Sequence, residues 1–368
     1  MSATKYDLII VGGGLVGGSL ACALGRAGLR VALVEALATA ARSQPGYDER
    51  VLALSWGSRR ILEAMGLWDD LAPGAEPIYR VHVSDRGHFG FVHLDAAEEG
   101  VPALGYVAPA RLIAQAIQTR MDGVAVFCPA RLLGFHLQEE RVEVEVASGG
   151  ESQLLSAALL VAADGGDSAI RQRLGFEALE RGYGHDAIIT TVTPDRPQPG
   201  VAFERFTDTG PLALLPMTEG RYSVVWTARE TETAAILGLD DRAFLDRLQA
   251  RFGYRLGGLA RPGRRLAYPL KLLLTRNPVR QRLVLIGNAA HTLHPVAIVT
   301  DRVRAGADPG APEALEAYRR LRGDDQDRTG LATDFLAHLF VNPWPPLRLA
   351  RDLGLLALDL LPGVRHGL

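Results

Sequence analysis

The chain has 368 residues, of which 48% are hydrophobic and 22% are charged, and its formal net charge is −2. This length allows two domains with sizeable cores, and the near-neutral charge excludes a general electrostatic attraction to nucleic acid. The two cysteines, Cys22 and Cys128, exclude a disulfide framework and fit a reducing compartment.

Residues 6–35 predict a strand, a helix and a second strand around a glycine-rich turn. The turn holds Gly12, Gly14 and Gly17 in the spacing G-x-G-x-x-G. In this pattern the first glycine permits a tight turn and the second lets the backbone approach a pyrophosphate. The third lets the helix pack closely on the strand, and the helix N-terminus offers free N–H groups to the phosphates. The stretch therefore predicts a dinucleotide site, with an ordinary glycine-rich strand-to-helix turn as the alternative.

Glu35 ends the second predicted strand, 18 residues after Gly17. A carboxylate at this place can accept hydrogen bonds from a ribose. Cys22 falls inside the intervening helix, where we expect a small core residue. No signal peptide precedes the first strand and no run of 18 apolar residues follows, so we expect a cytoplasmic protein without a spanning helix.

Helices and strands alternate through the middle of the chain. The hydrophobic spacing predicts a helix over 55–71, a hairpin over 78–94, a helix over 111–120, strands within 124–146 and a buried strand over 159–163. Residues 183–273 read mostly as strands, interrupted by a single helix over 241–251. Another buried strand, 283–286, follows, and the chain from about residue 311 reads as helical. The pattern favours a nucleotide-binding domain split by a β-rich insertion.

Two further motifs follow buried strands. Residues 160–171 read LVAADGGDSAIR, in which Asp164 can meet a ribose or form an Asx turn, and Arg171 can cap that turn or reach a phosphate. Residues 283–295 read LVLIGNAAHTLHP, in which Asn288 can bond a ribityl or phosphate oxygen. His291 and His294 have no neighbouring carboxylate or cysteine to complete a metal set, so no metal is expected.

The three motifs, in this order, resemble those of the class A flavoprotein monooxygenases, which use FAD to hydroxylate aromatic rings. The segments FERFTDTGPLALLPM, VHVSDRGHFGF and GNAAHTLHPVA are similar to the ubiquinone-biosynthesis branch, nearest to the 2-polyprenyl-6-methoxyphenol hydroxylases. The resemblance covers residues 5 to about 297 and resumes near 305. It implies an α/β fold with a Rossmann-like FAD-binding domain of the glutathione-reductase type, an inserted β-sheet substrate domain and a C-terminal helical tail.

The domain scheme drawn from this resemblance has six segments. The expected segments are FAD-binding residues 1–75, 105–180 and 276–304, substrate-domain residues 76–104 and 181–275, and C-terminal helices over 305–368.

The resemblance implies FAD as cofactor, NAD(P)H as reductant, and O₂ and a polyprenylated phenol as substrates, with oxygen transfer from a flavin C4a-hydroperoxide. The flavin performs this chemistry, so no side-chain nucleophile is needed or found. Two other functions stay open: an FAD-dependent reductase of prenyl chains, and a non-catalytic flavin-fold subunit of a lipid-biosynthetic complex. No nucleic-acid partner is expected.

The resemblance also assigns residues. The expected cofactor-binding set is Gly12, Gly14, Gly17, Glu35, Arg50, Arg111, Asp164, Gly165, Gly287, Asn288 and Pro295, with Gln115 a weaker candidate. Arg50, His291 and Pro295 are the candidates for positions near the flavin. Surface ion pairs are the alternative for the two arginines, and a structural role is the alternative for the histidine.

The β-rich insertion is expected to form the substrate wall. Its candidates are Pro216, Phe203 and Trp226, and an ordinary sheet core is the alternative for these positions. Residues 344–361 can form an apolar-faced helix that rests on the inner face of a membrane, on a ubiquinone-synthesis complex or on its own domain. A homodimer is also left open.

One departure from the family pattern follows the third motif. After His294-Pro295-Val296-Ala297, relatives continue with a glycine-rich turn, G-Q-G-x-N-x-G-x-R-D, whereas this chain continues with 298–302, IVTDR. Relative to that pattern, roughly 15 residues of turn and helix are missing, an estimate from the usual helical pitch and turn length. Either the protein lacks this turn, or the printed sequence omits residues encoded between Ala297 and Ile298. If the turn is truly missing, the affinity for FAD should fall sharply.

Overall fold

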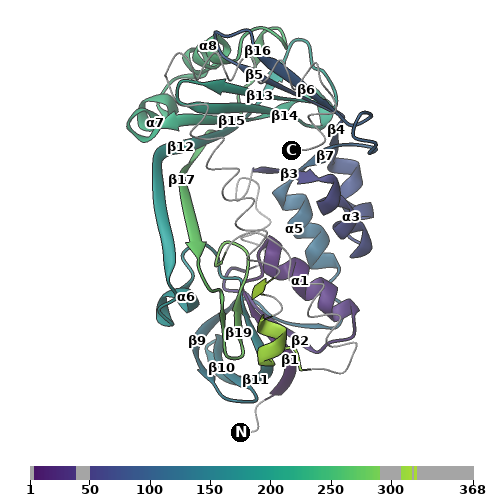
Figure 1. The fold of residues 1–368 in the computed structure, drawn as a ribbon, viewed down its shortest axis with the longest axis vertical. Coiled ribbons are helices and arrows are strands. Elements are labelled where there is room, and N and C mark those ends of the chain that lie inside the picture. Colours follow the sequence, from purple (N-terminus) through teal and green to yellow (C-terminus); the bar gives the residue numbers. More distant parts are fainter. Residues whose placement is uncertain (1–3, 39–49, 291–307, 317–318, 321–368) are drawn as a thin grey trace. The chain divides into compact units, whose positions relative to one another are not determined.

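A computed structural model describes residues 4–38, 50–290, 308–316 and 319–320 (Figure 1). The chain divides into two compact units, and each is built from three segments. The first unit consists of 1–48, 111–181 and 272–328, and the second of 49–110, 182–271 and 329–368. The domain boundaries predicted from sequence stay a proposal.

The first unit is organised around five parallel strands in the order β19, β11, β1, β2, β8. Their bounds are β1 Thr4–Val11, β2 Val31–Val34, β8 Val124–Phe127, β11 Glu151–Ala162 and β19 Leu283–Leu285. Three antiparallel strands extend the sheet: β9 Ala130–Leu137, β10 Val142–Ser148 and β18 Val279–Arg280. The labelled helices of this unit are α1 Leu15–Arg26, α5 Ala110–Thr119, which begins at the last residue of the second unit's first segment, and α6 Ala169–Arg173, and residues 312–316 are also helical.

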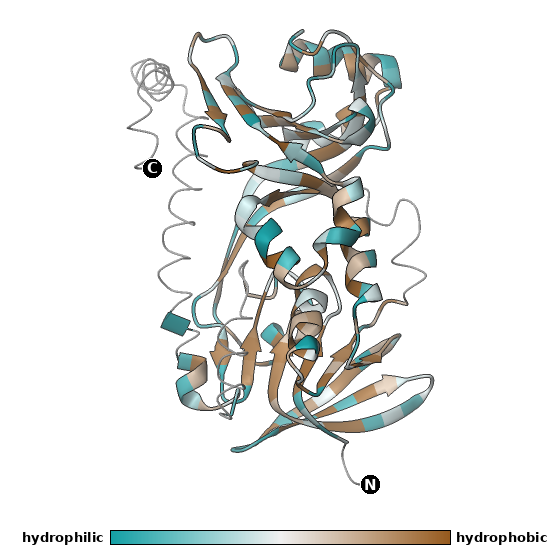
Figure 2. Ribbon diagram, turned by 90° about the vertical axis from the view of Figure 1, so that its right-hand side faces the viewer, coloured by the Kyte–Doolittle hydropathy of each residue, from teal (hydrophilic) through white to brown (hydrophobic). Residues whose placement is uncertain are grey.

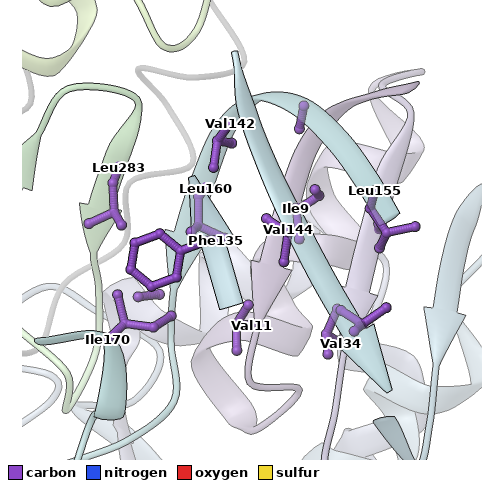
Figure 3. Packing of buried hydrophobic residues seen from close by; sticks show 14 of the residues in the cluster. Ile9, Val11, Val34, Phe135, Val142, Val144, Leu155, Leu160, Ile170 and Leu283 are labelled. Carbon is purple, nitrogen blue, oxygen red and sulfur yellow. The ribbon is translucent and has the colours of Figure 1, made fainter. Parts of the chain in front are cut away.

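Alternation along β1 distributes its side chains between two cores. Leu8 and Ile10 join Leu20 of α1 in one buried cluster. Ile9 and Val11 point to the other face and join a cluster that includes β9 and β10 (Figure 3). Because both faces of a parallel sheet are covered, its strands are continuous hydrophobic runs, which appear brown in Figure 2.

Cys22 is a core residue of α1, as predicted. Its Sγ donates to the carbonyl oxygen of Arg120 at 3.0 Å, just beyond the end of α5. Burial raises the pKa of the Cys22 thiol to about 11, so the group stays protonated and unreactive.

The second unit contains an eight-stranded sheet and a three-stranded sheet. The larger sheet has the order β16, β12, β15, β14, β13, β5, β6, with β17 also paired to β12. Its strands are β5 Arg80–Asp85, β6 Phe91–Asp95, β12 Ala178–Pro194, β13 Val201–Thr207, β14 Gly210–Pro216, β15 Tyr222–Arg229, β16 Leu259–Ala260 and β17 Leu266–Thr275. β5 and β6 form the hairpin predicted over 78–94.

The smaller sheet is antiparallel, with β7 between β3 and β4. Its strands are β3 Val51–Ser55, β4 Glu76–Ile78 and β7 Gly105–Pro109. The short helices of this unit are α3 Trp56–Ala64, α4 Trp68–Leu71, η1 Ala72–Gly74 and η2 Thr218–Gly220. The predicted helix over 55–71 is therefore two helices, α3 and α4, separated by residues 65–67.

Two helices interrupt the strands of the larger sheet, where the sequence predicted one. α8 spans Asp241–Phe252 as expected, and α7 spans Glu230–Leu237. The sequence of α7, ETETAAIL, has two β-branched threonines and no one-sided apolar stripe, so its helical period is weak. Within the described residues, no helix is long and apolar enough to cross a bilayer.

Candidate cofactor site

The glycine-rich turn lies where β1 meets α1, at the carboxyl ends of the parallel strands. Backbone hydrogen bonds join these ends: Gly12 N–H donates to Val34 O at 2.8 Å, and Ala163 N–H donates to Val11 O at 2.7 Å. β1 lies between β2, which follows it in the chain, and β11, which comes much later. Ligands of open α/β sheets bind at such a change of strand order.

The three glycines of this turn have different surroundings. Gly12 has φ +102°, and a Cβ there would lie 2.3 Å from the carbonyl oxygen of Ala163. A Cβ on Gly17 would lie 2.0 Å from the carbonyl oxygen of Gly12. Gly12 and Gly17 are therefore required by the packing of the chain on itself.

Gly14 differs because an added Cβ would have no heavy atom within 4 Å. It is the N-cap residue of α1, and no side chain caps that helix. The first N–H groups of α1 therefore have no N-cap side chain as acceptor, and they lie at the positive end of the helix dipole. This open N-terminus is suited to phosphate oxygens.

Glu35 stands directly after β2 and is largely buried. Its Oε2 accepts a hydrogen bond from Gly13 N–H at 2.6 Å, and its Oε1 accepts one from Leu37 N–H at 2.7 Å. The carboxylate is thereby fixed against the glycine-rich turn. Each carboxylate oxygen can accept more than one hydrogen bond, so the group can also serve a ribose hydroxyl.

Asp164 follows β11 on the other side of β1. Its Oδ2 accepts a 3.3 Å hydrogen bond from Ile170 N–H, whereas its Oδ1 is buried and has no partner among the residues that the structure describes. A buried carboxylate oxygen without a donor is costly, so Oδ1 is suited to a ligand hydroxyl. Gly165 follows with φ +91° and open space where a Cβ would stand.

The third motif packs against the first. Gly287 has φ +58°, and a Cβ there would lie 3.1 Å from Cβ of Val16, in the first turn of α1. Asn288 is exposed at this point, and the two alanines that follow are fully buried. Asn288 thus follows a glycine that packs on the first turn of α1, and its contact with a cofactor stays a prediction.

Arg171 links the second and third motifs. Only 3% exposed, it donates from Nη1 to Ala289 O at 3.2 Å and from Nη2 to Gly166 O at 2.6 Å. Of the two roles considered for Arg171, the structure shows the one in which it satisfies the backbone of the turn. The side chain holds the two loops in register.

The remaining predicted residues lie outside this constellation or outside the described chain. Arg111 and Gln115 are exposed on one face of α5, one turn apart. Arg50 belongs to the second unit, where its guanidinium lies 5.3 Å from the ring centroid of Tyr268. Their contacts with a cofactor stay predictions. His291, His294 and Pro295 fall among the residues that the structure does not describe. Over the described residues, no group of three potential metal ligands is found.

The expected substrate wall requires a correction. The ring of Phe203 lies 5.5 Å from that of Phe252 in α8, and the ring of Trp226 lies 5.7 Å from that of Phe244. Both side chains belong to the buried cluster between the sheet and its helices, and Trp226 is 1% exposed. These positions fit the alternative interpretation, an ordinary sheet core, because alternation reveals two faces but not which one the helices cover. Contact of Pro216 with a substrate stays a prediction.

The geometry of the first unit thus defines a Rossmann-like dinucleotide-binding fold. Residues 5–298 match the family described as the FAD binding domain, and the chain belongs to that family. The fold and the resemblance to the flavoprotein monooxygenases are therefore confirmed, and FAD is the cofactor of this family.

Curated relatives are similar over nearly the whole chain. The ubiquinone hydroxylase UbiL of Rhodospirillum rubrum is 38% identical over 378 aligned positions, covering 97% of this chain and 87% of that protein. The 3-demethoxyubiquinol 3-hydroxylase of Escherichia coli is 29% identical, covering 98% of this chain and 96% of that protein. The predicted membership of the ubiquinone-biosynthesis branch is confirmed by these relatives.

Solved structures share the fold at lower identity. The p-nitrophenol 4-monooxygenase PnpA of Pseudomonas putida superposes with a TM-score of 0.77 at 18% identity, covering 100% of this chain and 97% of that chain. HpxO of Klebsiella pneumoniae, determined as a single-residue variant in complex with FAD, gives a TM-score of 0.72 at 19% identity, covering 95% of this chain and 94% of that chain.

The alignments also bear on the departure after Ala297. The alignment with the Rhodospirillum protein has 378 positions, more than the 368 residues of this chain, so this chain has no residue at some of them. The family match ends at residue 298, one residue beyond Ala297. Both explanations of the departure stay open.

Proposed function

We propose that this protein is an FAD-dependent monooxygenase that hydroxylates a polyprenylated phenol in ubiquinone biosynthesis, with NAD(P)H as reductant and O₂ as co-substrate. The observation that carries the flavin part is the convergence of three motifs, separated in sequence, at one edge of the parallel sheet. The substrate class rests on the curated relatives, whose names describe hydroxylases of ubiquinone biosynthesis.

In this proposal, different residues of the first unit bind different parts of FAD. The N-terminus of α1 with Gly14 would hold the pyrophosphate, Glu35 would hold the adenosine ribose, and Asp164 Oδ1 and the Asn288 amide would hold hydroxyls of the ribityl side. When bound, FAD supplies the activation of dioxygen. The protein then has to orient the phenol, control its protonation and exclude water.

Purified protein loaded with FAD tests this function directly. We expect NAD(P)H oxidation and O₂ consumption to be stimulated by a short-chain prenylated phenol. The product should gain one oxygen atom, detected by mass spectrometry after reaction under isotopically labelled dioxygen. A product that gains two hydrogens and no oxygen would instead identify a prenyl-chain reductase. Protein that stays colourless with excess FAD would support a non-catalytic subunit.

Contact with a membrane surface or with other ubiquinone-synthesis proteins is a separate proposal. It rests on the apolar sequence of 344–361, which lies outside the described residues. Co-sedimentation of the full chain with anionic lipid vesicles, compared with a chain that ends at residue 343, tests it. Equal sedimentation of the two would refute the membrane contact.

A further inference from the structure

A carboxyl group stands on the face of the larger sheet that its helices do not cover. On β13, Phe203 packs on Phe252 of α8, and Arg205 Nε donates to the carbonyl oxygen of Arg251 at 3.1 Å. Successive side chains of a strand point to opposite faces. Glu204, between these two residues, therefore projects away from α8.

The neighbours of Glu204 on this face are apolar. In register, Glu204 pairs with Val83 of β5 on one side and Ala213 of β14 on the other. The row continues from Ala213 to Val225 of β15 and then to Ile189 of β12. All five residues are partly buried, and Glu204 is the one ionisable group of the row.

The smaller sheet packs on one end of this face. Ala202, the preceding residue of β13 on the same face, belongs to a buried cluster with Ile78 and Val107 of the smaller sheet. None of the residues in the Glu204 row belongs to that cluster. Glu204 thus lies two residues beyond Ala202 on the same face of β13, outside that cluster.

No described residue hydrogen-bonds or forms an ion pair with the Glu204 carboxyl, and burial alone raises its pKa to about 7. The nearest ionisable side chain on the same face of the neighbouring strands is Asp85, which pairs with Phe206 one alternation further along. A carboxyl group of this kind is a stronger base than an ordinary glutamate and is matched to proton transfer near neutral pH.

We propose that the Glu204 face binds the aromatic ring of the phenol substrate and that Glu204 accepts the proton of its hydroxyl group. The proposal rests on the proposed function. The phenol O–H bond breaks, the proton moves to a carboxylate oxygen of Glu204, and the electron pair stays on the phenolate oxygen. The apolar row contacts the ring, and the negative charge of the phenolate makes the ring carbons more nucleophilic.

A phenol matches both features of this surface. Its hydroxyl is a hydrogen-bond donor for a carboxyl group that has no partner among the described residues, and its ring is an apolar body for the row of aliphatic side chains. A ligand without a donor hydroxyl would leave the carboxyl unsatisfied. If Glu204 accepts the hydroxyl proton, the protein should therefore bind a phenol more tightly than its methyl ether.

The test measures binding of 2-prenylphenol and of its methyl ether, 2-prenylanisole, to the FAD-loaded full chain at pH 8 by calorimetry. Wild type should prefer the phenol, and Glu204→Gln should lose that preference by a factor on the order of ten to one hundred. Affinity for the ether should change little, which shows that the variant is folded. Arg205→Gln is the matched control, because it removes a charge from the adjacent residue on the opposite face, and it should keep the preference.

The pH dependence gives a second readout. Preference for the phenol should weaken below about pH 7 in wild type, as Glu204 becomes protonated, and should not vary over this range in Glu204→Gln. Retention of the preference in Glu204→Gln, or its absence from wild type, would overturn the proposal. Because this readout needs no turnover, a wild type that shows the expected preference but forms no hydroxylated product would refute the proposed function alone.

Discussion

The edge of the parallel sheet, where we propose that FAD binds, and the Glu204 face of the larger antiparallel sheet, where we propose that the phenol binds, are built in different ways. At the first, backbone dominates: glycine turns, a helix N-terminus and one buried carboxylate oxygen lie at the carboxyl ends of the parallel strands. At the second, side chains dominate, and a single carboxyl group stands in an aliphatic row. Glycine spacing in the sequence predicts a binding surface that is built from backbone. A surface built from side chains cannot be predicted in this way, because the sequence does not show which face of the sheet the helices cover.

The largest expected effect distinguishes Gly17, which the packing of the chain requires, from Gly14, which leaves space for a ligand. Gly17→Val should lower the free energy of unfolding by more than about 4 kcal/mol, because its Cβ would collide with backbone at Gly12. Gly14→Val, the matched control, should change the free energy of unfolding by about 1 kcal/mol or less yet weaken FAD binding at least about tenfold, because its side chain enters open space where phosphate would lie. Denaturant unfolding and FAD titration measure both. Equal stability losses would contradict this division of roles.

The two faces of the larger sheet should respond unequally to truncation. Trp226→Ala is expected to lower the free energy of unfolding by about 3–5 kcal/mol, because it opens a cavity under α7 and α8. Val225→Ala, one residue away on the other face, should cost roughly 1 kcal/mol. Urea unfolding of the two variants tests the assignment of faces, and a larger loss for Val225→Ala would reverse it.

The tie between the second and third motifs should contribute to both stability and cofactor binding. Arg171→Met leaves the carbonyls of Gly166 and Ala289 without their donor and should cost about 2–3 kcal/mol. Arg173→Met removes an exposed arginine of the same helix and should cost less than about 1 kcal/mol. Thermal unfolding with and without FAD compares them. Equal losses of stability in the two variants would contradict the role of Arg171 in linking the second and third motifs.

The smallest effect concerns pH and the Glu204 carboxyl. Its pKa is raised from about 4.5 to about 7 on folding, so between these values the folded state binds the proton and the unfolded state does not. Wild-type stability relative to Glu204→Gln should therefore fall as pH rises through this window, by an amount on the order of 2 kcal/mol. Urea unfolding at several pH values measures the difference. A difference that is flat or rises with pH would show that the carboxyl is not desolvated.

Prediction from sequence succeeded where a short segment carries the whole geometry. The turn of Gly12, Gly14 and Gly17 and the carboxylate of Glu35 lie within one strand–helix–strand unit, so spacing alone places them. The pairing of β1 with β11, which brings Asp164 beside that turn, joins residues about 150 positions apart and became predictable only through the family's motif order.

The residues that sequence did not identify depend on tertiary packing. Alternation over 201–207 separates Glu204 from its neighbours, but nothing local says that α7 and α8 cover the other face. For the same reason the sequence predicts Phe203 and Trp226 in a substrate wall, whereas both side chains lie in the core beneath the helices. The sequence allows Arg171 to be a phosphate ligand or a cap, and its carbonyl partners, Ala289 and Gly166, come from distant or looped backbone that the local sequence does not reveal.

The central claim is that FAD lies along the edge where the three motifs meet, with Asp164 Oδ1 bonded to one of its hydroxyls. Titration of FAD into wild type and Asp164→Ala, followed by flavin fluorescence, tests it most directly. We predict saturable binding to wild type and an affinity lower by a factor on the order of ten to one hundred in the variant, whose stability without FAD is changed by no more than about 1 kcal/mol. Unchanged affinity in Asp164→Ala, or no binding by wild type, would contradict this account.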